Sequence, residues 1–314
     1  MKIAFLLYPT AGVKVNEDTS FWVMHELVRR GHRVTYFESN RLFWADGSPH
    51  AFLREARLHP RHGYLPSSEA RRPISLRELD CIFIRKEPPF DGEYLHALQL
   101  LESVKRDVFV LNDPQGIALC NEKLFTLAFS RHIPETLVTE NTDLAAAFVR
   151  GLKGRGVLKP LDDKAGKGVL LVSSGDKNLP SLLDLATASG KRKVLLQRFA
   201  KGGENGDKRL LVLGGRILGC FARKPRRGDF RANLSAGGSM HRSAVTAGDK
   251  RLVEAMAPEL LRNGLYFAGL DVIGDALIEV NVTSPSGIPE VRQLEKKALE
   301  KDVADFIEGK VRGF

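Results

Sequence analysis

Apolar runs alternate with amphipathic stretches along the first part of the chain, and this alternation limits the folds open to it. Lys2–Tyr8 and Arg33–Glu38 are apolar runs of strand length. Between them Thr19 or Ser20 can cap a helix that ends at Gly31. The pattern continues with expected strands over Asp80–Arg85 and Asp107–Leu111 and an expected helix over Tyr94–Lys105. Strands joined by helices run parallel and are covered on both faces, so residues 1–120 predict an α/β domain with a parallel sheet.

Two segments of this first part depart from the regular pattern. The turn after the first strand, Tyr8-Pro9-Thr10-Ala11-Gly12, has no GxGxxG spacing, so we predict no dinucleotide site. Residues 41–78 are rich in proline and arginine, and we expect an irregular, partly mobile segment there. Within it, Ala45-Asp46-Gly47-Ser48 is typical of a hairpin turn.

From Asn121 onward, short strands outnumber helices. We expect an α+β unit of two subdomains, residues 121–196 and 197–314. Its expected strands are Pro134–Val138, Gly156–Leu161, Val169–Ser173, Val194–Phe199, Arg209–Leu213, Arg216–Ala222, Gly269–Ile273 and Ala276–Val280. Its expected helices are Glu122–Phe129, Leu144–Arg150, Leu182–Ser189, Lys250–Asn263 and a charged amphipathic helix over Val291–Val311.

Composition excludes several classes of protein. The 314 residues contain 43% hydrophobic residues and no apolar run long enough to span a membrane. Cys81, Cys120 and Cys220 are far apart, which argues against a disulfide framework or a zinc site and indicates a reducing cytoplasm. The net charge of +10 suits anionic ligands. The basic residues are dispersed and carry no nucleic-acid-binding motif, so a solvated basic face is favoured over a nucleic-acid site.

Acidic and amide side chains gather on one expected hairpin near the C-terminal end. Glu279 and Asn281 are two residues apart on an apolar strand and so point to one face. A three-residue loop at 274–276 would place Asp271 opposite Glu279, whereas a two-residue Gly-Asp turn would place them on opposite faces. Two carboxylates and an amide oxygen on one face suit Mg²⁺. A plain hairpin with its polar face in water is the alternative.

Basic and glycine-rich segments supply candidate anion sites. Lys159 lies inside the apolar strand Val157–Leu161, and Lys123 lies at a helix start; each needs a phosphate or a salt-bridge partner. The loop Asp162–Val169 can wrap an anion with backbone N–H groups, although most such loops are plain turns. Between Asp207 and Gly238 the chain is dense in arginine and glycine, as in a mobile lid or a disordered basic loop.

In this order, these segments resemble the ATP-grasp superfamily, and within it the bacterial glutathione synthetase family. The likeness covers nearly the whole chain. Its specific strings are Arg85-Lys-Glu-Pro-Pro-Phe-Asp91 and Asn281-Val-Thr-Ser-Pro285; the glycine-rich stretches are less specific. Further matching strings are Cys120–Phe125, Pro134–Thr139, Leu158–Asp162, Gly206–Arg209, Ala232–Gly238 and Gly269–Asp275. The resemblance implies an N-terminal pre-ATP-grasp domain over residues 1–120, followed by a two-subdomain ATP-grasp unit over 121–314.

The resemblance also implies roles for residues of this chain. The nucleotide would contact Lys123, Lys159, Gly166, Gln197, Arg198, Phe199 and Asp207. Two magnesium ions, which manganese can replace, would bind Asp271, Glu279 and Asn281. The transferred phosphoryl group and the substrate carboxylate would lie among Arg209, Arg223, Arg231 and Asn233, with Ser20, Arg85 and Ser284 near the dipeptide.

The implied reaction joins γ-glutamylcysteine to glycine with ATP as co-substrate, through an acyl phosphate, in a cytoplasmic homo-oligomer without nucleic-acid or membrane partners. Asp163 and Ala165 stand where the family's phosphate loop usually has glycine, which puts the closed geometry of that loop in question. Another carboxylate–amine ligase, such as one that adds glutamate to a peptide end, and a non-catalytic ATP-binding protein remain the alternatives.

Overall fold

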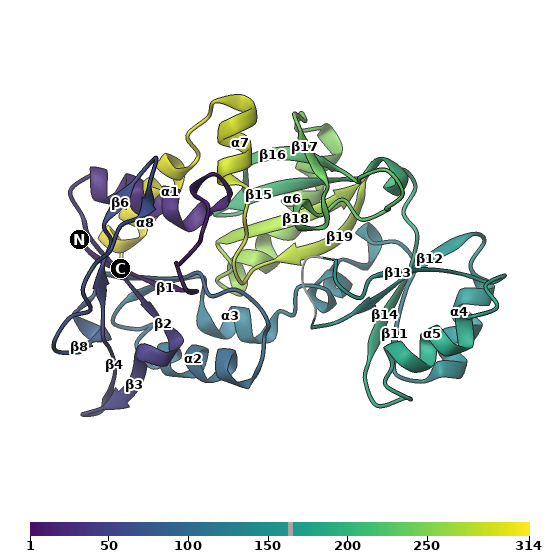
Figure 1. The fold of residues 1–314 in the computed structure, drawn as a ribbon, viewed down its shortest axis with the longest axis horizontal. Coiled ribbons are helices and arrows are strands. Elements are labelled where there is room, and N and C mark those ends of the chain that lie inside the picture. The colour runs from purple at the N-terminus through teal and green to yellow at the C-terminus, as the bar shows by residue number, and fades with distance from the viewer. Residues whose placement is uncertain (163–165) are drawn as a thin grey trace.

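A mostly parallel sheet forms the N-terminal part of the molecule. The structure is a computed structural model that describes residues 1–162 and 166–314. The sheet has the order β10-β9-β1-β2-β5, and its first four strands run parallel (Figure 1). Their bounds are β1 Lys2–Leu7, β2 Arg33–Glu38, β9 Cys81–Ile84 and β10 Phe109–Leu111, with the short antiparallel β5 at Arg54–Glu55. The predicted α/β fold class is therefore confirmed.

Helices bury both faces of this sheet. The helices are α1 Thr19–Arg29, α2 Gly92–Glu102 and α3 Pro114–Leu119. On β1, Ile3 and Phe5 join one hydrophobic cluster with residues of α1, while Ala4 and Leu6 join another with residues of α2. This is why β1 reads as a continuous apolar run and not as an alternating one. The cap of α1 is neither Thr19 nor Ser20 but Asp18, whose carboxylate accepts from the Ser20 N–H.

Short strands replace the irregular segment expected over residues 41–78. The expected turn is confirmed, since Asp46 and Gly47 have φ values of 48° and 71° between β3 Leu42–Ala45 and β4 Ser48–Ala51. The remaining strands are β6 Leu58–His59, β7 Gly63–Tyr64 and β8 Ile74–Ser75.

A second, antiparallel sheet with the order β11-β14-β12-β13 lies at the far end of the molecule (Figure 1). It comprises β11 Thr136–Thr139, β12 Arg155–Pro160, β13 Leu170–Ser173 and β14 Val194–Arg198, with α4 Thr142–Gly151 and α5 Leu179–Ala186. The helix expected at Glu122–Phe129 is a 3₁₀ segment, η4 Leu124–His132, which is interrupted by non-helical backbone at Phe129. Five further 3₁₀ turns are η1 Val15–Glu17, η2 Ser39–Arg41, η3 Leu76–Glu78, η5 Gly203–Asn205 and η6 Leu234–Ala236.

A third sheet lies between the other two and is antiparallel throughout, in the order β17-β16-β15-β18-β19. Its strands are β15 Asp207–Leu213, β16 Arg216–Lys224, β17 Ser239–His241, β18 Phe267–Ile273 and β19 Ala276–Asn281, and α6 Ala247–Arg262 packs against it. The first sheet lies within residues 1–120 and the third within residues 197–314, whereas β14 of the second sheet ends at Arg198, past the predicted boundary at residue 196. The division into domains stays an interpretation.

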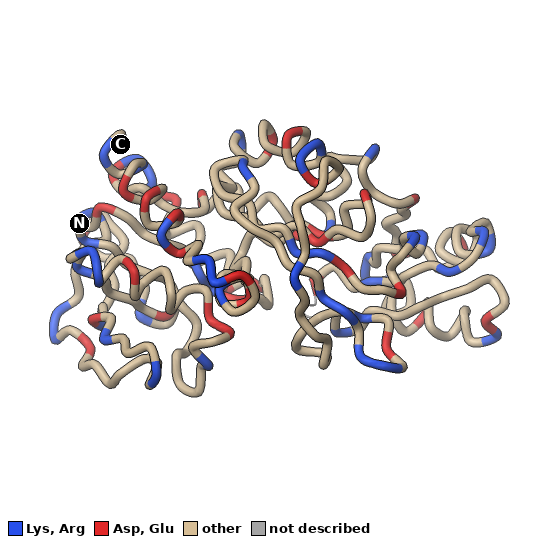
Figure 2. The backbone as a smooth tube through the Cα atoms, turned by 90° about the horizontal axis from the view of Figure 1, so that it is seen from above, with Lys and Arg blue, Asp and Glu red and all other residues tan. Residues whose placement is uncertain are grey.

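Two helices, α7 Ile288–Glu295 and α8 Glu300–Arg312, replace the single helix expected over Val291–Val311. The chain breaks at Lys296, which takes a left-handed conformation with φ 60°. This break lets α8 return to the N-terminal sheet and pack beside α1 (Figure 1), where Arg30 pairs with Asp305 at 2.6 Å. Among the described residues no helix has the length and apolarity needed to cross a membrane. Figure 2 shows basic and acidic positions interspersed over both halves of the molecule.

Candidate active site

The hairpin of β18 and β19 places its carboxylates on one side through a bulge. Ile273 pairs with Ala276 across a two-residue Gly274-Asp275 turn, and Val272 pairs with Leu277. The register then shifts by one residue, so that Asp271 pairs with Glu279. Asp271 and Glu279 line the same cavity, as predicted. Of the two turns considered, the two-residue turn forms, and the bulge prevents it from placing the two carboxylates on opposite faces.

Two arginines from neighbouring strands hold the Asp271 carboxylate. Arg209 Nε donates to Asp271 Oδ1 at 2.5 Å, and Arg223 lies 2.9 Å from Asp271 Oδ2. Arg223 also donates to both oxygens of Asp207, at 2.7 and 2.8 Å. Burial by itself would raise the pKa of Asp271, but the two guanidinium groups lower it to about 2. Burial raises the pKa of Asp207 despite its contact with Arg223.

Both predicted lysines are buried beside these carboxylates. Lys159 Nζ donates to Gln197 Oε1 at 2.9 Å, and Lys123 Nζ lies 3.3 Å from Glu279 Oε1. Burial lowers the pKa of Lys159 to about 8, with the charge of Lys123 acting in the same direction and Glu279 opposing it. A bound anion would supply the charge partner that Lys159 now lacks among the described residues.

These groups line a cavity between the second and third sheets. The predicted nucleotide residues meet there, together with lid residues, and the members are Lys123, Lys159, Gly166, Gln197, Arg198, Phe199, Asp207, Arg231, Asn233, Asp271 and Glu279. Gly166 lies under the lid: its carbonyl accepts from Arg231 at 3.2 Å, and a Cβ at Gly166 would lie 2.6 Å from Asn233 Oδ1. The positions 163–165, where the sequence departs from the family's glycines, lie outside the described residues.

Two backbone N–H groups at the strand end expected to contact adenine already form hydrogen bonds within the protein. The N–H groups of Arg198 and Phe199 donate to the carbonyl oxygens of Glu135 and Arg155, at 2.8 and 2.9 Å. The implied contact of residues 197–199 with a base stays a prediction.

A second, larger cavity of about 890 Å³ adjoins the first. The two cavities share Asn233 and Glu279 in their walls. Arg209, Arg223, Asn281 and Ser284 also line the second cavity, and so do residues of the first domain such as Glu17. A ligand in each cavity would therefore meet the other at Glu279.

Two predicted substrate residues lie beneath the second cavity and not in its wall. The Arg85 side chain is 2% exposed; its Nε donates to Ser20 Oγ at 2.9 Å and its Nη1 to the carbonyl of Pro285 at 2.9 Å. Ser284 Oγ in turn donates to the Arg85 carbonyl at 3.4 Å. The geometry favours a supporting role for Arg85 and Ser20, and their direct contact with substrate stays a prediction.

The side chains of the hairpin fit a hard divalent cation by the chemistry of their donors. Asn281 Nδ2 donates to the Gly269 carbonyl at 3.0 Å, so its amide oxygen is oriented away from that bond, and Asn281 lines the second cavity. Asp271 Oδ1 accepts only from Arg209 Nε among the described residues and keeps a lone pair. With Glu279, these groups offer the oxygen ligands that Mg²⁺ takes.

Glu122 is an acidic residue in the wall of the second cavity for which the sequence predicted no role. Its Oε1 accepts from the Val282 N–H, the Thr283 N–H and the Thr283 hydroxyl, at 3.0, 3.2 and 2.8 Å. Burial raises the pKa of Glu122, and Glu279 adds to the rise. Glu122 thus joins the start of the second unit to the loop after β19. The only feature of the sequence that points to Glu122 is its place beside Lys123 at the start of an expected helix.

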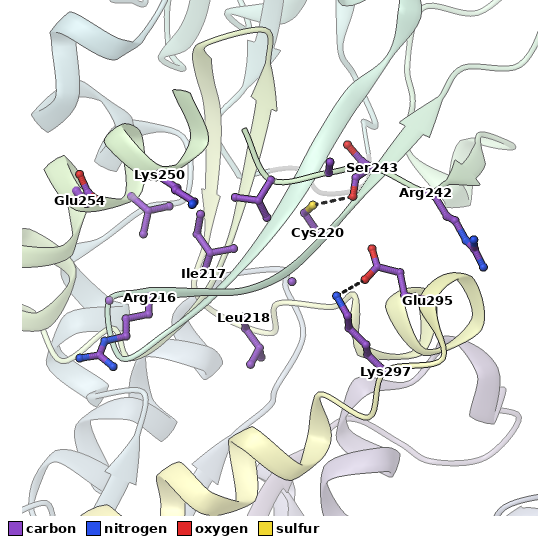
Figure 3. Close-up of a pocket in the computed structure, with 15 residues that line it drawn as sticks. Arg216, Ile217, Leu218, Cys220, Arg242, Ser243, Lys250, Glu254, Glu295 and Lys297 are labelled. Atoms are coloured by element: carbon purple, nitrogen blue, oxygen red, sulfur yellow. Dashed lines mark hydrogen bonds and ion pairs between the residues drawn. The ribbon is translucent and has the colours of Figure 1, made fainter. Parts of the chain in front are cut away.

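A third cavity, of about 940 Å³, lies on the other side of β16 and takes no part in this arrangement (Figure 3). Glu295 and Lys297 pair in its wall at 2.7 Å, and Cys220 Sγ donates to the Ser243 carbonyl. None of the predicted site residues lines it.

The fold of this chain is also found in solved ATP-grasp proteins. A Chryseobacterium gregarium RiPP-associated ATP-grasp ligase in complex with ADP and a peptide is similar, with a TM-score of 0.69 at 16% identity over 99% of this chain and 97% of that one. A D-cycloserine synthetase is similar with a TM-score of 0.65 at 14% identity over 97% and 99% of the two chains. At these identities the likeness shows the fold alone.

The family follows from the sequence comparisons. Residues 1–118 match the prokaryotic glutathione synthetase N-terminal domain and residues 122–296 match the ATP-grasp domain of the same family. Glutathione synthetase of Gloeobacter violaceus is 38% identical over 98% of this chain and 96% of its own length. That of Vibrio cholerae is 39% identical over 99% and 98%. The chain belongs to the prokaryotic glutathione synthetase family and is an ATP-dependent ligase.

Proposed function

We propose that this chain joins the cysteinyl carboxylate of γ-glutamylcysteine to the amine of glycine, with cleavage of ATP to ADP and phosphate. The observation that carries the proposal is the meeting of two cavities at Glu279 and Asn233. One cavity has the lysines and small residues that suit a nucleotide, and the other has room and polar walls for two small substrates. A phosphoryl group at the junction would be within reach of both.

Each step of this reaction has a group of this chain suited to it. Lys123 and Lys159 would bind the phosphates of ATP, while Arg209 and Arg223 would hold the substrate carboxylate as it attacks the γ-phosphorus. Arg231 and Asn233 would cover the transferred phosphoryl group from the lid. The amine of glycine then attacks the acyl phosphate and displaces phosphate through a tetrahedral intermediate, whose oxygen charge the arginines stabilise.

No protein nucleophile is needed. The three cysteines are free and buried, and none of them lines either cavity of the site among the described residues.

Asp271, Glu279 and Asn281 would hold two Mg²⁺ ions, or Mn²⁺ in their place. When bound, such ions neutralise the charge of the phosphate oxygens. We further propose a cytoplasmic homo-oligomer that acts on small molecules alone, without nucleic-acid or membrane partners.

The test is release of ADP by the purified protein with Mg-ATP, γ-glutamylcysteine and glycine, each omitted in turn. We expect turnover only when all three are present, with glutathione formed in equal amount. Turnover with a different acid–amine pair, for example glutamate and a peptide end, would replace these substrates and keep the ligase. ATP binding without turnover on any pair would instead identify a non-catalytic ATP-binding protein.

A further inference from the structure

The carboxylate of Glu290 is a feature of the second cavity that the roles above leave unexplained. Glu290 lies in the first turn of α7 and lines the cavity on the same helical face as Gln293. The residue is 6% exposed, and its Oε2 atom has no hydrogen-bond partner among the described residues. A buried carboxylate oxygen without a donor is costly, so a cavity that contains one suits a ligand that supplies the donor.

Glu290 does not serve as the cap of its helix. The N–H groups of Gly287 and Ile288 donate to Thr19 Oγ1, at 3.2 and 3.3 Å, so α1 caps α7. Burial raises the pKa of Glu290, while its own backbone N–H, Arg209 and Arg223 lower it by less. Both arginines already donate to other carboxylates, Asp271 and Asp207. The nearby cations therefore leave Oε2 without a donor.

Other acidic side chains in the wall of this cavity are already engaged. Glu279 pairs with Lys123 at 3.3 Å, Glu122 accepts three hydrogen bonds from Val282 and Thr283, and Glu17 pairs with Lys14 at 3.2 Å. The arginines of the wall suit substrate carboxylates, which leaves the cationic ends of the substrates to a carboxylate. Glu290 has the charge, the burial and the open oxygen for that contact.

We propose that Glu290 binds the primary ammonium group of a substrate in the second cavity. The inference rests on the proposed function, in which two such groups enter this cavity: the ammonium of glycine and the α-ammonium of the γ-glutamyl residue. An ammonium donates up to three hydrogen bonds and carries the opposite charge. The chemistry of the contact is the same for both sources.

Glu290→Gln tests the contact, because it keeps the size of the side chain and removes its charge. We expect the KM for the substrate that carries the bound ammonium to rise by roughly tenfold to a hundredfold, with the KM for ATP unchanged. Glu295→Gln is the matched control: Glu295 is on the same helix but pairs with Lys297 in the remote cavity (Figure 3), so all three KM values stay at wild type.

Two substrates without an ammonium group identify the source. Hydroxylamine, neutral at mildly alkaline pH, replaces glycine and traps the acyl phosphate as a hydroxamate. Glutaryl-cysteine replaces γ-glutamylcysteine and lacks only the α-amino group. If Glu290 binds glycine, the defect of the variant disappears with hydroxylamine; if it binds the γ-glutamyl end, the defect disappears with glutaryl-cysteine.

Unchanged KM values for both substrates in Glu290→Gln would overturn the inference. A defect that persists with hydroxylamine and glutaryl-cysteine together would also overturn it, since Glu290 would then serve structure alone. Failure of the wild-type protein to use γ-glutamylcysteine and glycine contradicts the proposed function instead. The same comparison would then be made with the acid–amine pair that does support turnover.

Discussion

Charged side chains at the site neutralise one another in a connected set of contacts. Arg223 lies between Asp207 and Asp271, and Arg209 shares Asp271 with it. Lys123 pairs with Glu279. Such pairing makes the burial of these charges tolerable, because an unpaired charge in this environment would be strongly destabilising. Binding of nucleotide and metal would therefore exchange partners among charges that the fold already holds in place.

Glu279 is the residue at which the two cavities meet, and its substitution tests the metal assignment. We expect Glu279→Gln to lower kcat by about a hundredfold or more, because an oxygen ligand with full charge is replaced by a neutral amide. The fold should persist, because the size of the side chain is kept. ADP release over a magnesium titration measures the first effect and the unfolding midpoint the second. An active variant with ordinary magnesium dependence would refute the assignment. Glu254→Gln, in the remote cavity, is the control.

Lys159 makes both ATP binding and the stability of the unliganded protein depend on pH. Its pKa is lowered to about 8, so the side chain loses its charge as the pH rises through that value. We expect the Kd for ATP to be constant below about pH 8 and to rise above it by up to about tenfold per unit. Burial in the folded protein disfavours the charged form of Lys159. The contribution of Lys159 to the free energy of unfolding therefore becomes more favourable as the pH rises from about 8 to the ordinary lysine pKa, because the folded protein has by then lost this charge.

Calorimetric titration of ATP over this pH range makes the measurement. Lys159→Met should bind ATP weakly at every pH, without the rise that begins near pH 8. A wild-type Kd that stays flat well above pH 8 would contradict the role of this charge.

At the scale of elements, local patterns predicted the strands well and their mutual register poorly. The apolar run of β1 and the turn at Asp46-Gly47 were sufficient, because burial and turn chemistry are local properties. The register of β18 and β19 depends on a bulge next to the turn, and no residue type in the sequence predicts that bulge. The break at Lys296 was missed for a related reason: the amphipathic pattern continues across it, and a lysine in a left-handed conformation has no sequence signal.

Gly206 permits the close approach of β15 and β16, the two strands that carry Asp207 and Arg223. It has φ 103°, and a Cβ there would lie 1.9 Å from the Arg223 carbonyl oxygen. We expect Gly206→Ala to separate the start of β15 from β16 and so displace Asp207 and Arg223. The expected cost is about 2–4 kcal/mol in the free energy of unfolding, with a severalfold weaker Kd for ATP.

The control for Gly206→Ala is Gly202→Ala. Gly202 also has a positive φ, 90°, but a Cβ there would meet nothing within 4 Å. Backbone strain alone should then cost about 1–2 kcal/mol and leave ATP binding intact. Chemical denaturation and ATP titration of both variants make the comparison. Equal effects in the two variants would show that backbone strain, and not the clash with β16, determines the result.

At the scale of the whole molecule, side chains of residues 1–120 bind to the third sheet and to the segment that follows it. Arg85 links Ser20 to the Pro285 carbonyl, and Thr19 caps α7. The contacts of Arg85 with Pro285 and of Thr19 with Gly287 span 200 and 268 residues and follow from topology, so a single sequence could not predict them. They explain why Arg85 and Ser20, expected at the substrate, lie beneath the cavity that they support.

Asn112 makes the most complete of these connections. Its Nδ2 donates to the carbonyl oxygens of Phe267 and Val282 at 2.7 and 2.9 Å, and its Oδ1 accepts from the Phe267 N–H at 2.8 Å. The residue is 2% exposed, so Asn112→Ala would leave three buried backbone groups without partners. At about 1–2 kcal/mol for each, the free energy of unfolding should fall by roughly 3–6 kcal/mol.

The order of two variants separates lost hydrogen bonds from lost volume at Asn112. Asn112→Asp keeps the volume and the acceptor, but it places a carboxylate against two carbonyl oxygens, so we expect it to be less stable than Asn112→Ala at neutral pH. Protonation of that carboxylate restores one donor, so the difference in stability between Asn112→Asp and Asn112→Ala should become smaller as the pH falls. Asn40→Ala, at an exposed asparagine, should change the free energy of unfolding by less than about 0.5 kcal/mol. Denaturant unfolding measures all three, and an Asn112→Asp protein as stable as wild type would show that these hydrogen bonds do not join the two sheets.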